Sequence, residues 1–260
     1  MARLRGEPNV LDPRNLIRIM PAEGVKDVTA QPPSLAKVVF LMHHQRAVLF
    51  VNGELADGKV VIQAVRKDDY LIAVDGGLRV LLSLGLFPNL LIGDLDSISP
   101  AEVERMQQIG VEIRRFPHEK NETDLELALL AAAAADYQSI WLVAALGGRL
   151  DQTLANLHLL LLPELTGRDV RLFDGQVEVF LIRDDAAIHG QPGDTLSLIA
   201  FQGLATGITT HGLYYPLTDE TLFPERSRGI SNRMLANMAR VTIETGVLLC
   251  IHTHDYLDQP

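Results

Sequence analysis

The sequence predicts an α/β domain with a mostly parallel sheet, followed by an all-β sandwich domain. From residue 47 to about residue 162, short apolar runs alternate with turns and helical segments, which is typical of parallel strands joined by helices. Beyond residue 167 the runs remain strand-like but are separated by Gly, Pro and Asp turns, as in a sandwich of two small sheets. We therefore divide the chain into residues 1–45, an extension, residues 46–168, the α/β domain, and residues 169–260, the sandwich domain.

The extension contains five prolines and shows neither a helical nor a strand period. We expect Met42 to be the biological start and the residues before it to be dispensable for activity and solubility.

The strands expected in the first domain are its short apolar runs, at residues 47–51, 70–74, 90–92, 111–113 and 140–145. Residues 60–67 are ambiguous, because their residue types favour a strand whereas the topology requires a crossover helix. Both assignments stay open.

Terminal signals predict the helices. The segment Ser-Pro-Ala-Glu at residues 99–102 is a capping box with proline at the first helical position, and Gly110 is well placed as the C-terminal cap. Thr-Asp-Leu-Glu at residues 123–126 is a second capping box, which opens an alanine-rich helix that continues to residue 135. A third helix is expected from about residue 151 until Pro163 stops it.

The second domain has six expected strands and one weak helical signal, the latter at residues 232–238. The strands are expected at residues 170–173, 178–182, 195–200, 208–211, 241–244 and 247–252.

Composition narrows the functional classes. A net charge of −10 over 260 residues argues against a nucleic-acid-binding protein, which usually needs a basic face. No stretch approaches the ~20 apolar residues of a membrane span. The single cysteine, Cys250, cannot form an internal disulfide and lies in an apolar run, so we expect a small core residue and a cytoplasmic protein.

Five polar clusters follow the predicted strands or lead into the next helix. The clusters occupy residues 52–53, 75–77, 93–97, 120–124 and 147–151. In an open α/β sheet, ligands bind outside the carboxyl ends of the strands, where helix N-termini also favour phosphate. These clusters therefore predict a single site at that edge.

Asp94 and Asp96 are the most informative residues of these clusters. If the backbone is extended there, both carboxylates point to the same side, which is unfavourable unless a cation neutralises them. Mg²⁺ takes oxygen ligands from carboxylates and from substrate phosphates, and Asp124 adds a third carboxylate. For Asp96 or Asp124 alone, a helix cap or a turn is an equally good reading. For the group we favour a Mg²⁺ site.

The remaining clusters carry weaker signals. Asp75 stands beside Gly76 and Gly77, which permit close backbone approach, although most such pairs are simple turns. Arg149 and Lys120 are candidate phosphate contacts, but a lysine before a helix is usually only solvated.

His252 and His254 can share one face of a strand, but no acidic or cysteine partner is close to them in the sequence, so we do not expect a zinc site. The chain has no Walker lysine loop and no GxGxxG pattern, and neither P-loop chemistry nor dinucleotide binding is supported.

Taken in order, the motifs resemble those of the thiamine pyrophosphokinase family. The matching segments are Asp-Gly-Gly at 75–77, Gly-Asp-Leu-Asp-Ser at 93–97, Lys-Asn-Glu-Thr-Asp at 120–124, Gly-Gly-Arg-Leu-Asp-Gln at 147–152, Gly-Leu-Tyr-Tyr-Pro-Leu at 212–217 and Ser-Asn at 231–232. The match extends from about residue 48 to residue 251.

This resemblance implies a Rossmann-like nucleotide-binding domain, a thiamine-binding β-sandwich and a homodimer with thiamine near the subunit interface. The residues that correspond to the family's sites fall into three groups. Metal and catalysis are implied for Asp94, Asp96 and Asp124, nucleotide binding for Asp75, Gly76, Gly77, Lys120, Gly148, Arg149 and Asp151, and substrate binding for Ser97, Ser231 and Asn232.

Three positions depart from the family pattern. Leu95 replaces a phenylalanine in what we expect to be an apolar contact only. Gln152 replaces a histidine and alters a nucleotide contact, whereas Asn121 replaces an aspartate and removes one negative charge beside the predicted metal site.

The resemblance implies attack of the thiamine hydroxyl on the β-phosphorus of ATP, with AMP leaving. No general base is assigned, and Asp75 is only a candidate. Two alternatives remain: a related pyrophosphokinase that acts on another hydroxymethyl compound such as a pterin, and a non-catalytic thiamine or nucleotide sensor, for which Asn121 is the main argument.

Overall fold

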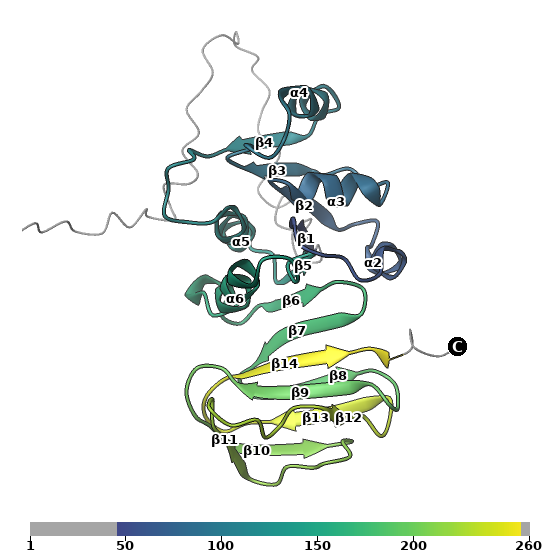
Figure 1. The fold of residues 1–260 in the computed structure, drawn as a ribbon, viewed down its shortest axis with the longest axis vertical. Helices are drawn as coiled ribbons and strands as arrows, with labels where there is room; N and C mark the ends of the chain where they lie inside the picture. The colour runs from purple at the N-terminus through teal and green to yellow at the C-terminus, as the bar shows by residue number, and fades with distance from the viewer. Residues whose placement is uncertain (1–45, 256–260) are drawn as a thin grey trace, which may run out of the picture.

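The computed structural model describes residues 46–255 and is shown in Figure 1. The predicted extension, with Met42 and residues 1–45, lies outside the described residues. Within them the structure has an α/β part at one end and a β-sandwich at the other, as the sequence predicts. No helix in the described range 46–255 is long and apolar enough to cross a membrane.

Six parallel strands form the α/β half of the main sheet, in the order β6-β5-β1-β2-β3-β4. Their bounds are β1 Ala47–Phe50, β2 Tyr70–Val74, β3 Leu90–Gly93, β4 Glu112–Arg115, β5 Ser139–Val143 and β6 Asp169–Phe173. The strands β1, β2, β3 and β5 are almost fully buried, because helices cover both faces of this half.

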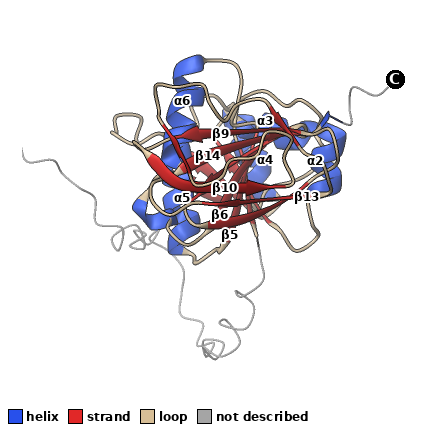
Figure 2. Cartoon of the chain, turned by 90° about the horizontal axis from the view of Figure 1, so that it is seen from below, coloured by secondary structure: helices blue, strands red, loops and turns tan. Residues whose placement is uncertain are grey.

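The helices lie in two layers, one on each face of the sheet. Side chains of α5 (Asp124–Ala134) pack on one face, where α6 (Leu150–Leu159) also contributes. The opposite face is covered by α2 (Gly58–Ala64), α3 (Gly77–Ser83) and α4 (Pro100–Gln108). Viewed from the sandwich end, the strands run through the middle of the molecule, with α6 at the top left, α5 at the left and α2 at the right of the view (Figure 2).

The helix starts agree with the predicted caps, whereas α6 ends at Leu159, before Pro163 is reached. Ser99 and Glu102 form the complete capping box of α4, and Gly110 follows that helix with φ 86°, a conformation that glycine adopts without strain. Thr123 caps α5 through a bond from the backbone N–H of Glu126. The ambiguous segment 60–67 lies partly in α2, which Asp57 caps, so the topological requirement prevails over strand propensity.

The main sheet continues without a break into the second half of the chain. Strand β6 pairs in parallel with β5 on one side and antiparallel with β7 (Val177–Ile182) on the other. Beyond β7 follow β14 (Leu248–Thr253), β9 (Thr195–Ala200) and the short β12 (Asn232–Arg233), so the sheet has ten strands. The predicted boundary at residues 168 and 169 falls directly before β6, and it remains a prediction.

A second, four-stranded sheet packs against this antiparallel end. The short 3₁₀ helix η2 (Pro163–Leu165) lies in the connection between α6 and β6. Its strands, in spatial order, are β11 Glu220–Leu222, β10 Ala205–His211, β13 Met238–Thr242 and β8 Asp185–His189. A separate hydrophobic core lies between the two sheets and includes Phe180, Leu198 and Cys250. The sandwich and the buried, free Cys250 are therefore as predicted, and burial raises the pKa of the Cys250 thiol.

The weak helical signal at residues 232–238 was misleading. Asn232 and Arg233 pair with β9, Met234 forms a bridge to Leu213, and Met238 begins β13. Pairing with neighbouring strands decides the conformation of this segment, as tertiary context often overrides local propensity.

Candidate functional site

A cavity of about 300 Å³ opens at the carboxyl ends of the central parallel strands. This is the edge of the sheet at which the sequence places the polar clusters. The residues that line it are Val51, Asn52, Val74, Asp75, Asp94, Lys120, Thr123, Asp124, Leu125, Gln152 and Asn156.

Three aspartates converge in this cavity. Asp75 directly follows β2, Asp94 follows β3, and Asp124 is the first residue of α5. One carboxylate oxygen from each lies within 4.8 Å of the other two, a spacing suited to a shared cation. Asp75 Oδ1 is buried and has no hydrogen-bond partner among residues 46–255, so the site has an acceptor oxygen that a cation would satisfy.

Gly93 allows the three aspartates to approach each other. Its φ is 146°, and a Cβ at this position would lie 3.1 Å from Cβ of Asp75 and 3.2 Å from Cγ of Asp124. A side chain here would therefore push against two of the three carboxylate-bearing residues, in addition to straining the backbone.

Lys120 lies between two of these carboxylates and is not a solvated surface lysine. Its Nζ is 3.0 Å from Asp124 Oδ1 and 3.5 Å from Asp94 Oδ2, and its side chain is only 12% exposed. Burial lowers the pKa of Lys120, but the two aspartates outweigh this effect and the net pKa is raised. Lys120 is thus a positive charge held in place beside Asp94 and Asp124.

The pKa values of the two neighbouring carboxylates move in opposite directions. Burial raises the pKa of Asp124, and the charges of Asp94 and Asp75 reinforce the increase, which outweighs the effect of Lys120. Burial also acts to raise the pKa of Asp94, but hydrogen bonds from Asp96 N and His118, together with Lys120, lower it overall. Asp94 therefore keeps its charge to lower pH than Asp124 does.

Asp96 belongs to a second, more exposed group, with Asp94 and His118. The Nδ1 atom of His118 lies 3.0 Å from Asp94 Oδ2 and 3.6 Å from Asp96 Oδ2. The Asp96 side chain is 59% exposed, and its Oδ1 accepts a hydrogen bond of 3.1 Å from Ser97 Oγ. Sequence reasoning missed His118, because it lies outside the five clusters.

The expectation of an extended backbone between Asp94 and Asp96 is wrong. Leu95 has φ 62°, and Asp94 Oδ1 accepts a 3.2 Å bond from the backbone N–H of Asp96, which closes a tight turn. Leu95 itself is buried in the core beneath α3 and α4, consistent with the expected apolar contact. The two carboxylates are therefore brought together by a turn and not by strand alternation.

The Asp-Gly-Gly segment lies against the end of β1. A Cβ on Gly77 would lie 1.9 Å from the carbonyl oxygen of Phe50, and a Cβ on Gly76 would lie 2.8 Å from the Asn52 side chain. Asp75 has φ 43° and donates its N–H to the Ile92 carbonyl. The glycines allow α3 to begin directly beside the cavity.

The Gly147–Asp151 segment forms an exposed rim. Gly148 donates its N–H to Glu54 Oε1 at 3.0 Å, a contact that sequence reasoning missed because the two residues are distant in the chain. Arg149 and Asp151 form a two-bond ion pair, at 2.6 Å and 3.1 Å, in which both side chains are largely exposed. Arg149 is thus paired with Asp151 and does not line the cavity, whereas the next residue, Gln152, does.

Comparison with known proteins identifies the family in which this arrangement occurs. Residues 61–172 match the family model "Thiamin pyrophosphokinase, catalytic domain", and residues 184–248 match "Thiamin pyrophosphokinase, vitamin B1 binding domain". The chain belongs to the thiamin pyrophosphokinase family. The first match contains the three converging aspartates, and the second contains most of the sandwich.

Individual relatives agree with the family models. The thiamine pyrophosphokinase of Bacillus subtilis (strain 168) is 29% identical over 186 residues, which cover 71% of this chain and 87% of the relative. A crystal structure of thiamine pyrophosphokinase from Bacillus subtilis has a TM-score of 0.72 at 25% identity and covers 82% of this chain and 100% of that one. Thiamin pyrophosphokinase from Candida albicans shares the fold, with a TM-score of 0.68 at 17% identity over 82% of this chain and 90% of that one.

Asn232 and Ser231, the predicted thiamine-binding residues, lie at the far edge of the main sheet. Asn232 is buried, and its amide bonds the backbone N–H and C=O of Tyr215, which fixes the Tyr-Tyr turn of that family motif. Ser231 has φ 55° and donates its N–H to Ser197 Oγ. Seven strand-to-strand steps separate β12 from β2, a distance on the order of 30 Å. A single chain therefore does not bring these residues to the aspartates.

Of the departures from the family motifs, Asn121 is exposed in the turn before α5 and is not among the cavity-lining residues. Gln152 lines the cavity together with Asn156, which is buried and donates to the Ala145 carbonyl. The glutamine is consequently the departure placed to contact a bound ligand.

Replacement of Asp124 by Asn is expected to stabilise the protein at pH 7. Because the pKa of Asp124 is raised on folding, its ionised form is less favourable in the folded state, and protonation removes this penalty as pH falls through the raised pKa. The Asp124→Asn variant should therefore have a higher thermal midpoint than the wild type at pH 7, and the difference should shrink at lower pH. Asp136→Asn, at an exposed position, serves as the control; lower stability of Asp124→Asn at pH 7 would contradict the assignment.

Proposed function

We propose that this chain transfers the terminal pyrophosphate of ATP to the hydroxyl of thiamine, giving thiamine diphosphate and AMP. The observation that carries the proposal is the convergence of Asp75, Asp94 and Asp124 in one cavity, within a chain that belongs to the thiamin pyrophosphokinase family. We infer a cytoplasmic location from the single, buried and unpaired cysteine.

We further propose that Mg²⁺ binds at this cavity through Asp94, Asp96 and Asp124, with Asp75 facing the same space. The donors suit Mg²⁺, because Asp75, Asp94 and Asp124 offer carboxylate oxygens within 4.8 Å of one another, including the unsatisfied Asp75 Oδ1, and Asp96 lies in the adjoining group that shares Asp94. When bound, the ion would neutralise phosphate charge and hold the phosphates in place.

The protein's own residues then act mainly by positioning. Lys120 holds Asp94 and Asp124 at a fixed separation and offsets part of their charge. Gly76 and Gly77 allow α3 to begin close against the end of β1, beside the cavity, and Arg149 is a candidate phosphate donor on the exposed rim, where the N–H of Gly148 binds Glu54. To bind phosphate, Arg149 must first give up its ion pair with Asp151. This ion pair is exposed to solvent and therefore contributes little stability.

The activity is tested by incubating the purified full chain with thiamine, ATP and Mg²⁺ and measuring thiamine diphosphate and AMP. Both products should appear in equal amounts. A parallel panel of hydroxymethyl acceptors, including a pterin, should give no comparable AMP release. Thiamine binding without AMP formation would refute the transferase and support the sensor alternative.

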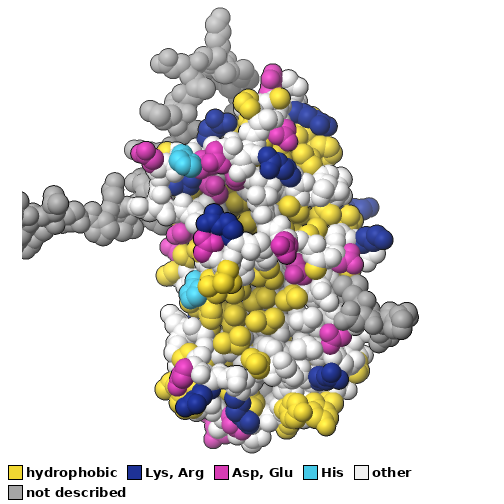
Figure 3. All heavy atoms as spheres, in the orientation of Figure 1, with side chains coloured by type: hydrophobic (Ala, Val, Ile, Leu, Met, Phe, Trp, Pro, Cys, Tyr) yellow, Lys and Arg dark blue, Asp and Glu magenta, His cyan; other side chains and the backbone are white. Residues whose placement is uncertain are grey.

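We propose that the active unit is a homodimer in which one chain supplies the aspartates and the other supplies the region of Ser231 and Asn232. Two observations support this: the separation of these groups within one chain, and an apolar surface on α6, where Leu150 is 71% and Leu154 49% exposed. Figure 3 shows hydrophobic side chains gathered near the middle of the molecule, where α6 approaches the antiparallel strands.

Mixing two inactive variants tests the shared site. Asp94→Asn removes a carboxylate, and Ser231→Arg places a bulky side chain at an exposed position of the thiamine-binding region. If each site uses residues from both chains, mixed dimers contain one intact site, and random exchange should restore about a quarter of wild-type activity. Separate incubation of each variant is the control. No recovery after demonstrated subunit exchange would refute the shared site.

A further inference from the structure

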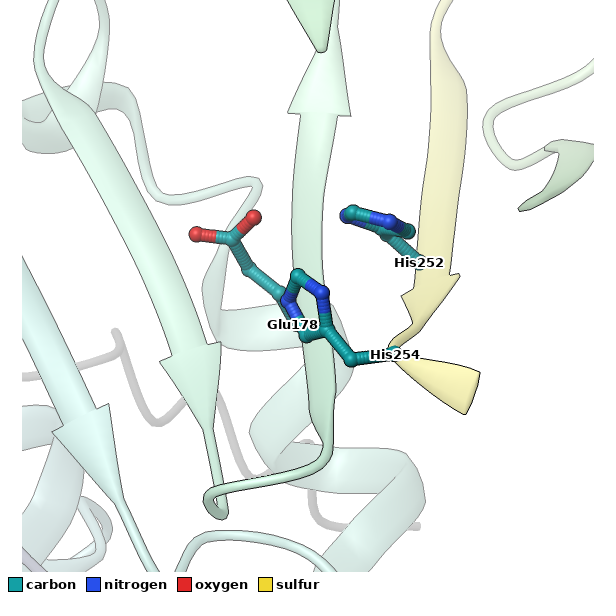
Figure 4. Close-up of side chains that lie close together, drawn as sticks. All are labelled: Glu178, His252 and His254. Atoms are coloured by element: carbon teal, nitrogen blue, oxygen red, sulfur yellow. The ribbon is translucent and has the colours of Figure 1, made fainter. Parts of the chain in front are cut away.

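A second group of metal-binding side chains lies in the sandwich domain, away from the aspartates. Glu178, His252 and His254 each offer one ligand atom, and these atoms lie within 4.8 Å of one another. Figure 4 shows the glutamate of β7 and the two imidazoles of the β14 region gathered in one space. Four strand steps separate β7 from β2, so this group is about 20 Å from the aspartates.

Strand register brings the group together. His252 and His254 are two residues apart and therefore project from the same face. Glu178 is the direct antiparallel partner of His252, and directly opposed residues share a face. The expectation that the histidines lack an acidic partner is thus wrong, because Glu178 and Asp194 are brought to them by the pairing of β14 with β7 and β9.

The protonation pattern of His252 leaves one nitrogen free. Its Nε2 lies 3.0 Å from Asp194 Oδ2, so Nε2 carries the proton and donates to the carboxylate. Its Nδ1 is buried and has no hydrogen-bond partner within residues 46–255, and the side chain is 0% exposed. A buried acceptor without a partner is costly, and a metal ion would satisfy it.

Asp194 has the environment of a carboxylate that orients a metal-binding histidine. Metal-ligating histidines usually donate their second N–H to a carboxylate, which fixes ring orientation and raises basicity. Asp194 is itself held by the backbone N–H groups of Gln191 and Asp255.

We propose that Glu178, His252 and His254 bind one divalent transition-metal ion of the Zn²⁺ class. Two imidazoles and one carboxylate form a three-residue ligand set that zinc accepts, with a fourth position left for water. The Arg171 ion pair uses Oε1 of Glu178 at 3.1 Å and leaves the second oxygen for the ion. The His254 side chain is 19% exposed, so the metal ion can reach the group from solvent at this residue.

Zinc titration of the metal-stripped full chain tests the proposal, with millimolar Mg²⁺ present to occupy the carboxylate site. The wild type should bind one equivalent of Zn²⁺. His254→Gln and Glu178→Gln should weaken binding at least about tenfold, and Asp194→Asn by about 10–100-fold. His158→Gln, at an exposed histidine on α6, and a His43→Gln, His44→Gln double variant should bind as the wild type does.

A measurement on the wild type alone keeps the test decisive if a variant fails to fold. Nitrogen-15 NMR of labelled histidines should show the His252 Nδ1 resonance shift on addition of one equivalent of Zn²⁺, while His158 stays unchanged. Absence of stoichiometric binding, undiminished binding in both His254→Gln and Glu178→Gln, or an unshifted His252 resonance would overturn the proposal. Because no thiamine or ATP is used, these outcomes are independent of the proposed kinase activity.

Discussion

Replacing Asp94 by Asn should lower kcat by about 10²–10³-fold, the usual cost of losing one preorganised charge at a reacting centre. Asp94 is the only residue shared by the Asp75–Asp124 group and the Asp96–His118 group, so its loss disables both. Steady-state formation of AMP under saturating ATP and thiamine measures the effect. Asp136→Asn, the same substitution at an exposed site in the same domain, should leave kcat unchanged. Near-normal turnover in Asp94→Asn would end the assignment of the cavity as the reaction site.

The same assay separates the roles of Asp75 and Asp96. If Asp94, Asp96 and Asp124 hold Mg²⁺ as proposed, Asp96→Asn should approach the loss seen with Asp94→Asn and should raise the Mg²⁺ concentration needed for half-maximal rate. If Asp75→Asn shows that pattern and Asp96→Asn does not, the ligand set is Asp75, Asp94 and Asp124, and the proposed role of Asp96 is incorrect.

Asp69→Ala should reduce the free energy of unfolding by about 3–5 kcal/mol, because it leaves a buried arginine without its partner. Arg46 and Asp69 form a two-bond ion pair at 3.0 Å and 2.6 Å, and their side chains are 3% and 1% exposed. Arg46 also lies 3.9 Å from the ring centroid of Trp141, so its position depends on β5 as well. Urea unfolding monitored by circular dichroism gives the difference.

Asp185→Ala is the matched control for this substitution. Asp185 forms a two-bond pair with Arg240 of similar geometry, but both side chains are exposed to solvent. Water screens such a pair, so its loss should change stability little. Equal destabilisation by the two substitutions would show that burial is not what makes the Arg46–Asp69 pair important.

Local patterns were sufficient to predict most elements of the fold. Strand β2 was predicted with its observed bounds, because a run of apolar, β-branched residues bounded by charged residues is unambiguous. The α4 helix carries its own start and stop signals in Ser99 and Gly110. By contrast, residues 232–238 have no such signals, and their conformation follows from partners on β9 and at Leu213 that are distant in the sequence.

The candidate site was predictable to the extent that it depends on topology. Parallel strands end at a common edge, which is why Asp75, Asp94 and Asp124 could be expected to meet. Contacts made by side chains from separate loops could not be inferred, such as those of His118 and Glu54. The Glu178–His252 pair was hidden for another reason: antiparallel register is set by the whole sheet, and a shift of one residue would turn either side chain to the opposite face.

Strand β6 hydrogen-bonds to both halves of the molecule, and this has a consequence for how the chain holds together. Because β6 pairs with β5 on one side and with β7 on the other, neither half of the molecule has a sheet edge of its own at this strand. A cut before residue 169 would leave the backbone amides and carbonyls of β5 open to foreign strands, a known route to aggregation. Loss of order in the sandwich should thus propagate through shared main-chain bonds, and the two halves are expected to melt in one cooperative transition.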